Sequence, residues 1–202
     1  MEIDPVPESS PSAHAQNLDP CRGVLFKNNC IYKHKLLRIN YTTYDVRRAQ
    51  DVVNPSTPHC DIMLLADQAA NDRVSEEMAP PHQFLYARVL GIYHANIIYV
   101  GSGMVDYTPQ RFKFLWVRWF EVLNHRGKDS DCLDQVSFLP LNHEDAFGFV
   151  DPVDVLRGCH IIPRFAGNKR YSAQSDVGDD TQVGLSPCAQ DRQDWNSYYV
   201  NR

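Results

Sequence analysis

Four aromatic side chains in the middle of the chain are of types that could bind a cation: Tyr93, Tyr107, Trp116 and Phe120. Readers of methylated lysine surround the ammonium group with two to four aromatic faces, each worth roughly 0.5 to 2 kcal/mol through cation–π attraction. Tryptophan and phenylalanine at strand spacing are more often core residues, and Arg118 near Trp116 could already occupy that face. An aromatic cage and a packed core are therefore both open from these residues alone.

A second candidate surface is basic. Residues 21–50 contain seven Lys or Arg against one acid, Asp45, whereas residues 51–83 contain six acids against Arg73 alone. A basic surface of this kind could contact phosphates, with Tyr41 and Tyr44 beside it, in binding that weakens steeply with salt. The alternative is a solvated face that neutralises its acidic neighbour. The candidate phosphate contacts are Lys33, Lys35, Arg38, Arg47 and Arg48.

Acids near the ends of predicted strands raise the question of a nuclease. A cut-and-join transposase uses three acids to hold two metal ions about 4 Å apart, on an RNase H-like scaffold rich in helices. Asp45, Asp61 and Asp151 are such acids, but few helices are indicated here, and Asp151 precedes a proline as a helix N-cap would. No phosphate-cradling glycine loop and no cysteine with a partner base occurs at a recognisable spacing. We predict no catalytic residue.

Cysteine and histidine lie close together in the sequence at three places: Cys30 with His34, His59 with Cys60, and Cys159 with His160. Adjacent side chains on a strand point to opposite faces, so the last two pairs cannot share one ion there. Two ligands also do not complete a zinc site. The six cysteines are scattered without a CxxC pair, which favours free thiols in a reducing compartment. We predict neither a metal nor a cofactor.

The elements that must position these residues are predicted to be strands. In residues 111–120 one face carries Leu115, Val117 and Trp119, and the other face is apolar as well, with Phe112, Phe114, Trp116, Arg118 and Phe120. Apolar residues on both faces imply a strand that is covered twice. If the strand predicted at 36–45 lies over Phe112, Phe114 and Trp116, these residues are core. Otherwise they are the best candidate for a binding surface.

Further strands are predicted at 61–65, 84–94, 133–139 and 159–162. Asp151 and Pro152 are expected to start one helical turn, which Gly158 ends as a C-cap. The predicted fold is mainly β: a small, mostly antiparallel β-barrel with a few short helical turns and disordered tails. We expect a disordered tail at 1–26, a barrel domain at 27–166, and a mostly disordered tail at 167–202 with a short aromatic segment at 195–200.

Five segments stand in the order found in one family: residues 38–51 (RINYTTYDVRRAQD), 86–94 (YARVLGIYH), 114–120 (FLWVRWF), 147–163 (FGFVDPVDVLRGCHIIP) and 194–201 (DWNSYYVN). Together they resemble the C-terminal region of fungal transposase-like proteins of the Plavaka type, in the Kyakuja-Dileera-Zisupton class, over roughly residues 27–202. The resemblance implies a transposon-derived nuclear protein, in a region that follows the presumed DNA-cutting core and has no assigned activity. That family continues beyond Arg202, so a truncated remnant without selected function is an alternative.

The order of an Ala-Arg-Val strand, a Val-Arg-Trp-Phe strand and an Asp-Pro-x-x-Val-x-Arg-Gly-Cys segment is also similar to the bromo-adjacent homology (BAH) module. That module is a chromatin-associated β-barrel that binds proteins, histone tails among them. The resemblance therefore implies a non-enzymatic module with a protein partner, a histone tail being one candidate. A DNA-contacting accessory domain is the alternative. No membrane segment and no small-molecule substrate is indicated.

Several residues are expected to organise the domain rather than to bind. We expect Trp119 to be core, Asp151 and Gly158 to shape the last turn, and Arg88, Arg118 or Arg157 to pair with acids. The predicted structural residues are Arg88, Trp119, Asp151, Arg157 and Gly158.

Overall fold

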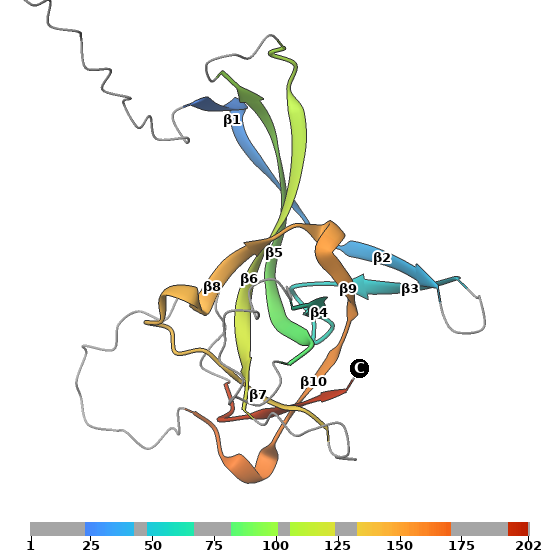
Figure 1. The fold of residues 1–202 in the computed structure, drawn as a ribbon, viewed down its shortest axis with the longest axis vertical. Helices are drawn as coiled ribbons and strands as arrows, with labels where there is room; N and C mark the ends of the chain where they lie inside the picture. Colours follow the sequence, from blue (N-terminus) through green and yellow to red (C-terminus); the bar gives the residue numbers. More distant parts are fainter. Residues whose placement is uncertain are drawn as a thin grey trace, which may run out of the picture.

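The computed structural model describes residues 23–42, 48–66, 82–100, 106–123, 133–170 and 194–201, with Arg48 described in its backbone only (Figure 1). The predicted tails lie largely outside these ranges. The described strands are β1 (Val24–His34), β2 (Leu37–Thr42), β3 (Arg48–Val53), β4 (Asp61–Leu65), β5 (Phe84–Tyr99), β6 (Gln110–Val122), β7 (Gln135–Phe138), β8 (Phe147–Val150), β9 (Val155–Gly158), β10 (His160–Pro163) and β11 (Tyr198–Asn201). Three 3-10 turns are described with them: η2 (Glu144–Ala146), η3 (Pro152–Asp154) and η4 (Phe165–Gly167).

The main sheet forms a nearly closed antiparallel β-barrel, as the sequence predicted. Its strand order is β10-β11-β7-β6-β5-β4-β9, and each neighbouring pair in this order is antiparallel. The two ends of this order, β9 and β10, are consecutive in the chain and are separated by Cys159 alone. The Cys159 backbone N–H still donates to the Asp61 carbonyl of β4, at 3.1 Å. The chain itself therefore closes the circle, which we call the ring.

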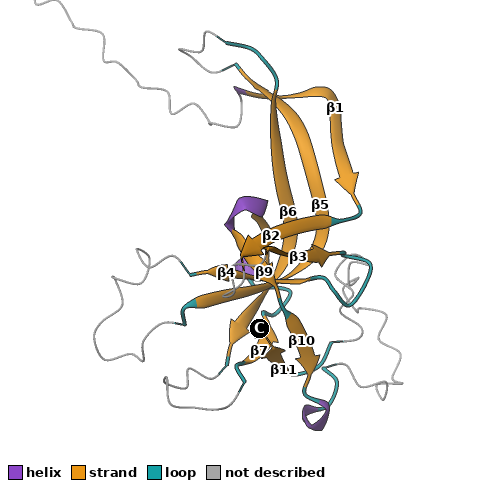
Figure 2. Cartoon of the chain, turned by 90° about the vertical axis from the view of Figure 1, so that its right-hand side faces the viewer, coloured by secondary structure: helices purple, strands orange, loops and turns teal. Residues whose placement is uncertain are grey.

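Strands β5 and β6 extend beyond the ring and form a twisted arm there (Figure 2). They pair with each other from Tyr86–Phe120 to Ile97–Gln110. The other edge of β5 pairs first with β4 and then, from Ile92 to Tyr99, with β1. We define the arm as β1 with Lys35, which follows it, residues 92–99 of β5, residues 110–115 of β6, and the described residues between the last two, 100 and 106–109.

A bulge marks the point where β5 changes neighbours. Val89 lies opposite Val117 and Gly91 opposite Trp116, so Leu90 is an extra residue without a partner. Bulges increase local twist and redirect a strand. A Cβ at position 91 would lie 2.3 Å from the ring of Tyr93, which folds back over Gly91, so a larger residue here would displace that ring. The sequence Val-Leu-Gly thus separates the ring from the arm.

Two cores lie on opposite faces of β4, β5 and β6. The first core includes Ile62, Val89 and Val117, and is covered by Ile39 and Val53 of the β2–β3 hairpin. The second core lies inside the ring and is built mainly from the aromatic residues Tyr86, Phe120, Phe138 and Tyr198, with Val136 and Val200. Burial of one such large side chain contributes about 1.5 to 3 kcal/mol. Within the ring, the prediction of doubly covered strands is confirmed.

Two arginines lie against the second core, Arg118 fully buried and Arg88 partly buried. Arg88 and Arg118 lie directly opposite each other on β5 and β6, and both guanidinium groups stack on Phe138, at 4.9 and 3.9 Å from its centroid. Like charges in this position repel each other, so each needs its own counter-ion. Arg88 Nε donates to Asp61 Oδ1 at 2.8 Å, and Arg118 Nη1 donates to Asp194 Oδ2 at 2.8 Å. The predicted pairing of these arginines with acids is confirmed.

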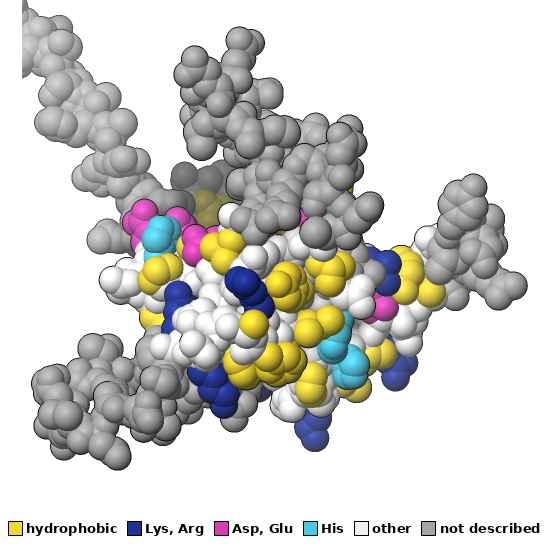
Figure 3. Space-filling model, turned by 90° about the horizontal axis from the view of Figure 1, so that it is seen from below, with side chains coloured by type: hydrophobic (Ala, Val, Ile, Leu, Met, Phe, Trp, Pro, Cys, Tyr) yellow, Lys and Arg dark blue, Asp and Glu magenta, His cyan; other side chains and the backbone are white. Residues whose placement is uncertain are grey.

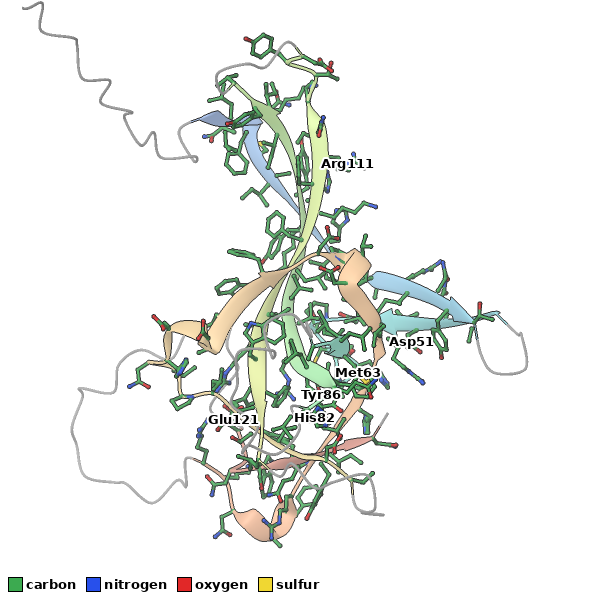
Figure 4. The ribbon with its side chains drawn as sticks, in the orientation of Figure 1. Asp51, Met63, His82, Tyr86, Arg111 and Glu121 are labelled. Atoms are coloured by element: carbon green, nitrogen blue, oxygen red, sulfur yellow. The ribbon has the colours of Figure 1, made fainter. Side chains whose placement is uncertain are left out.

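The hairpin is attached to the ring through Asp51 of β3 (Figure 4). Its carboxylate accepts hydrogen bonds from the Gly158 backbone N–H at 2.9 Å and from the Tyr41 hydroxyl at 3.2 Å. Arg157 Nε lies 3.8 Å from the same carboxylate, and its guanidinium stacks over Tyr41. Arg157 therefore also pairs with an acid, as predicted.

The turn near Asp151 is correctly predicted at its start but not at its end. Asp151 caps η3 by accepting a hydrogen bond from the Val153 N–H at 2.9 Å. The turn stops at Asp154, and Gly158 ends strand β9 rather than a helix. The prediction of a glycine C-cap was wrong because Val155, Leu156 and Arg157 are held extended by pairing with β4.

The sheet extends past both expected limits of the barrel domain. Strand β1 begins at Val24, before the expected boundary at residue 27. At the other end, the aromatic segment expected within the C-terminal tail is strand β11, which fills the ring between β10 and β7. Four residues cannot form a stable strand alone, so this segment depends on partners that are distant in the sequence.

Candidate functional site

The four residues proposed for an aromatic cage do not come together. Tyr93 and Trp116 lie near each other on one face of the arm and its base. Phe120 is 5% exposed and stacks on Phe138 in the second core, with ring centroids 4.0 Å apart. Tyr107 is 58% exposed and precedes Gln110, at the end of the arm farthest from the ring. The four-residue cage was wrong, because the ring closes over Phe120 but not over Trp116.

A different set of aromatic residues does assemble at the base of the arm. Tyr93 stacks on Phe114, Phe114 meets Phe149 edge-on, and Trp116 stacks on Phe147 with an interplanar angle of 4°. Strand β8 supplies the two phenylalanines by pairing with β6. These rings cover one another's faces, so they form a surface and not an open cage. We call Tyr93, Phe114, Trp116, Phe147 and Phe149 the aromatic row.

The aromatic row is not covered by the β2 strand. Leu37 and Ile39 of β2 pack against the first core, on the side of Leu115 and Val117. Phe149 is 68% exposed, and Phe112, next along β6 on the same face as Phe114, is 51% exposed. The described structure therefore leaves this face of the strand open, which makes it a candidate binding surface.

The arm is strongly basic. Residues 23–35 and 91–115 contain five of the chain's 20 Lys and Arg but only one of its 25 acids, Asp106. The described ring end, opposite the arm, instead shows apolar, basic and acidic side chains interspersed (Figure 3). The side chains of all five cations are exposed: Lys27, Lys33, Lys35, Arg111 and Lys113.

The predicted basic set is only partly located on this arm. Lys33 lies on β1 and Lys35 follows it, whereas Arg38 is exposed on the β2–β3 hairpin. Arg47 lies outside the described residues, and for Arg48 only the backbone is described, paired with Thr42. The structure adds Arg111 and Lys113, which sequence reasoning missed. Their signal was visible: on the face of Leu115, the apolar alternation of 111–120 gives way to cations towards its start.

A cavity near titratable groups does not resemble a catalytic centre. It has a volume of about 410 Å³ and lies between the hairpin and β9–β10, with Asp51, His59, Asp61 and His160 in its lining. Burial raises the pKa of the Cys60 thiol to about 12 and also raises that of Cys159, so neither is an activated nucleophile. Burial raises the pKa of Asp61 too, while Arg88 opposes that rise.

The acids considered for a nuclease have other roles where they are described. Asp61 is held by Arg88, Asp151 caps η3, and Asp45 lies outside the described residues. Within the described ranges, no three His, Cys, Asp or Glu side chains are placed to hold one metal ion. None of the described helical segments is long and apolar enough to cross a membrane.

Comparisons with protein-family models, with curated proteins and with solved structures found no match for this chain. The class that the coordinates define is a nearly closed antiparallel β-barrel with a projecting three-stranded arm. The arm carries the two candidate surfaces, one aromatic and one basic.

Proposed function

We propose that this chain is a non-enzymatic interaction module whose arm binds nucleic acid. The observation that carries the proposal is the charge of the arm, with five exposed cations and one acid in a chain whose net charge is -5. Outside residues 23–35 and 91–115 the chain has 24 acids against 15 Lys and Arg, so on average the rest of it repels polyphosphates. Binding would therefore be confined to the arm, where cations neutralise phosphates and release their counter-ions.

The aromatic content of the arm supports the same proposal. Proteins that bind single strands combine a basic track with aromatic rings on which bases stack, at about 1 to 3 kcal/mol per base. Tyr32, Tyr99, Tyr107 and Phe112 are large exposed aromatic residues of the arm and its end. The resemblance to transposase-like proteins agrees with a nuclear setting on DNA.

The proposal is tested by removing cations from β1 and its end. The variant Lys27→Gln/Lys33→Gln/Lys35→Gln is compared with Arg38→Gln/Arg164→Gln/Lys169→Gln, which removes three exposed cations elsewhere. Fluorescence anisotropy with labelled single-stranded and duplex DNA is recorded across a salt series. We expect the arm variant to bind roughly 10- to 100-fold more weakly, and the slope of log K against log salt to fall by about 2 to 3. The control should keep both values.

Two outcomes would overturn nucleic-acid binding. One is an arm variant that binds no more weakly than the control. The other is weak wild-type binding that does not change between low and moderate salt, since phosphate contacts must weaken with salt.

A second candidate function is protein binding through the aromatic row. The observation that favours it is the exposure of Phe149 beside Phe112, because large exposed apolar side chains that adjoin one another mark interaction sites. The neighbouring cations favour an acidic, aromatic segment of a partner protein over a basic one. A histone tail, which the BAH resemblance implied, is basic and would meet like charge along the arm.

A peptide array that includes histone tails separates these partners. A methyl-dependent hit that Trp116→Ala abolishes would support a reader of modified tails. Hits confined to acidic peptides, lost in Phe149→Ser but kept in the control Phe165→Ser, would support the acidic segment. Phe165 is as exposed as Phe149 but lies in η4, away from the arm.

A further inference from the structure

A pair of histidines lies on the face of the arm opposite the aromatic row. The strand register places Tyr32, His94 and Lys113 in one row across β1, β5 and β6. His34 lies one step along β1, and His34 Nε2 is 2.6 Å from His94 Nδ1. Tyr32 stacks on His94 from the other side, with centroids 4.7 Å apart and planes 9° apart. The imidazole of His94 is thus held between two rings.

The hydrogen bond between the two imidazoles restricts their protonation. One nitrogen must donate and the other must accept, so the accepting ring is neutral at that atom. The second nitrogen of each ring, His34 Nδ1 and His94 Nε2, has no hydrogen-bond partner among the described residues. His94 is only 8% exposed. These two ring nitrogens can therefore donate or accept a hydrogen bond to a ligand in the small cavity that both histidines line.

The cavity has a volume of about 180 Å³, enough for about six waters at roughly 30 Å³ each. The groups with charge or titratable protons in its lining are His34 from β1, Tyr93 and His94 from β5, and Arg111 and Lys113 from β6. Arg111 projects from β6 on the arm, as labelled in Figure 4. The element η3 contributes Pro152 and no charged side chain. The remaining lining residues are apolar: Leu36, Leu37 and Ile92.

The described lining has cations and imidazoles but no carboxylate. Burial lowers the pKa of His94, and Arg111, His34 and Lys113 lower it further because each disfavours another positive charge. Arg88 in the ring, by contrast, has the carboxylate of Asp61 beside it. An anion in this cavity would therefore meet positive groups and no described carboxylate.

We propose that His34, His94, Arg111 and Lys113 form a binding site for a phosphate-type oxyanion. Arg111 and Lys113 supply charge, and the free imidazole nitrogens supply directed hydrogen bonds. The oxyanion can be a phosphate of a polynucleotide or free inorganic phosphate, since the recognised chemistry is the same. The site does not rest on the proposed function of the arm, because inorganic phosphate can fill it without nucleic acid.

Bound anion should favour protonated histidine, so anion affinity should rise as the pH falls through the range where His94 titrates. Inorganic phosphate loses charge over the same range, which works in the opposite direction. Sulfate stays divalent and therefore isolates the contribution of the protein. We expect sulfate to bind several-fold more tightly at about pH 6 than at about pH 7.5.

The test uses the full chain and follows the histidine side-chain NMR resonances during titration with sodium sulfate and with sodium phosphate. We expect the rings of His34 and His94 to shift saturably with either anion, while His59 and His143 do not shift. The variant Arg111→Gln/Lys113→Gln should bind at least about tenfold more weakly, a loss of about 1.4 kcal/mol. The control Arg164→Gln/Lys169→Gln should bind as the wild type does. Both double variants replace exposed side chains, so the fold is retained.

Three outcomes would overturn the site: no saturable shift at either pH, equal shifts in the double variant, or shifts caused by an oligonucleotide but by neither inorganic anion. The last outcome would leave the proposed nucleic-acid binding intact. Conversely, saturable anion shifts in a protein that does not bind DNA would support the site while the proposed function fails. A 5′-phosphorylated oligonucleotide compared with its unphosphorylated form separates a terminal phosphate from a backbone phosphate.

Discussion

The ring and the arm share strands β5 and β6, yet the same kinds of side chain are buried in the ring and exposed in the arm. In the ring, Phe120 is covered by β7 and β11 and stacks on Phe138. In the arm, Phe112 lies on the same face of the same strand and is half exposed. The residue type and the alternation are identical. The difference is that the sheet curves around Phe120 and buries it, whereas it does not curve back over Phe112.

The two regions also treat charge differently. The ring buries Arg118 fully and Arg88 partly, and provides one carboxylate for each. The arm exposes five cations and has one acid in its sequence. Paired buried charges hold a structure together only when both partners are present. The exposed cations of the arm have no described acid beside them, so their charge is open to a ligand.

The strongest test of this comparison is to break a buried pair in the ring. Asp194→Ala should lower the free energy of unfolding by about 3 to 5 kcal/mol, because fully buried Arg118 is left without its counter-ion. Urea denaturation followed by tryptophan fluorescence measures the loss. The control Asp154→Ala removes an exposed acid and should change stability by less than about 0.5 kcal/mol. A small loss in Asp194→Ala would mean that Arg118 does not need this partner.

The same side-chain deletion made in both regions compares them directly. Phe120→Ala should cost about 3 to 5 kcal/mol, since it removes a ring from the second core and leaves a cavity. Phe112→Ala should cost less than about 0.5 kcal/mol, because half of that side chain is already exposed. Equal losses in the two urea curves would show that the arm is covered in solution, for example by a second copy.

The bulge that separates the two regions can be tested with one methyl group. Gly91→Ala should destabilise the protein by about 1 to 3 kcal/mol, because the new Cβ would meet the Tyr93 ring at 2.3 Å. The double variant Gly91→Ala/Tyr93→Ser removes the obstructing ring and should recover most of the loss. Additive losses in the double-mutant cycle would place the strain elsewhere.

The smallest expected effect is on the pH dependence of stability. His94 has a lowered pKa in the folded protein, so as the pH falls below 6.5, the ordinary pKa of histidine, the unfolded chain takes up the proton first. Stability should therefore decline with falling pH below that value, and His94→Gln should remove this contribution. Urea midpoints at several pH values measure it. A His94→Gln variant with an unchanged slope would assign the decline to other groups.

The long strands, β4 and the polar turn at Asp151 could be predicted from the sequence because they depend on local patterns. Alternation identifies β5 and β6, and Asp-Pro identifies a capped turn. Strand β1 was missed because Asn28 and Asn29 interrupt it with positive φ angles of 60° and 50° and shift its register. Strand β11 was missed as a strand because four residues carry too little signal without β7 and β10.

The candidate sites show the same difference between what local patterns predict and what depends on contacts between distant strands. The cations Lys33 and Lys35 and the aromatic residues Tyr93 and Trp116 were recognisable by type. Their true neighbours were not, because His34, His94 and Lys113 are brought together by pairing across three strands. Such pairing depends on register, and register depends on a bulge and on ring closure.

The sequence by itself determined the β class, the doubly apolar strands and the arginines that require acids, because alternation and the cost of buried charge act residue by residue. Only the tertiary structure decided where the double cover ends. That limit is set by the circle of β4, β7, β9, β10 and β11, whose strands come from distant parts of the chain. Side chains inside the circle became core, and the same kinds of side chain beyond it became surface.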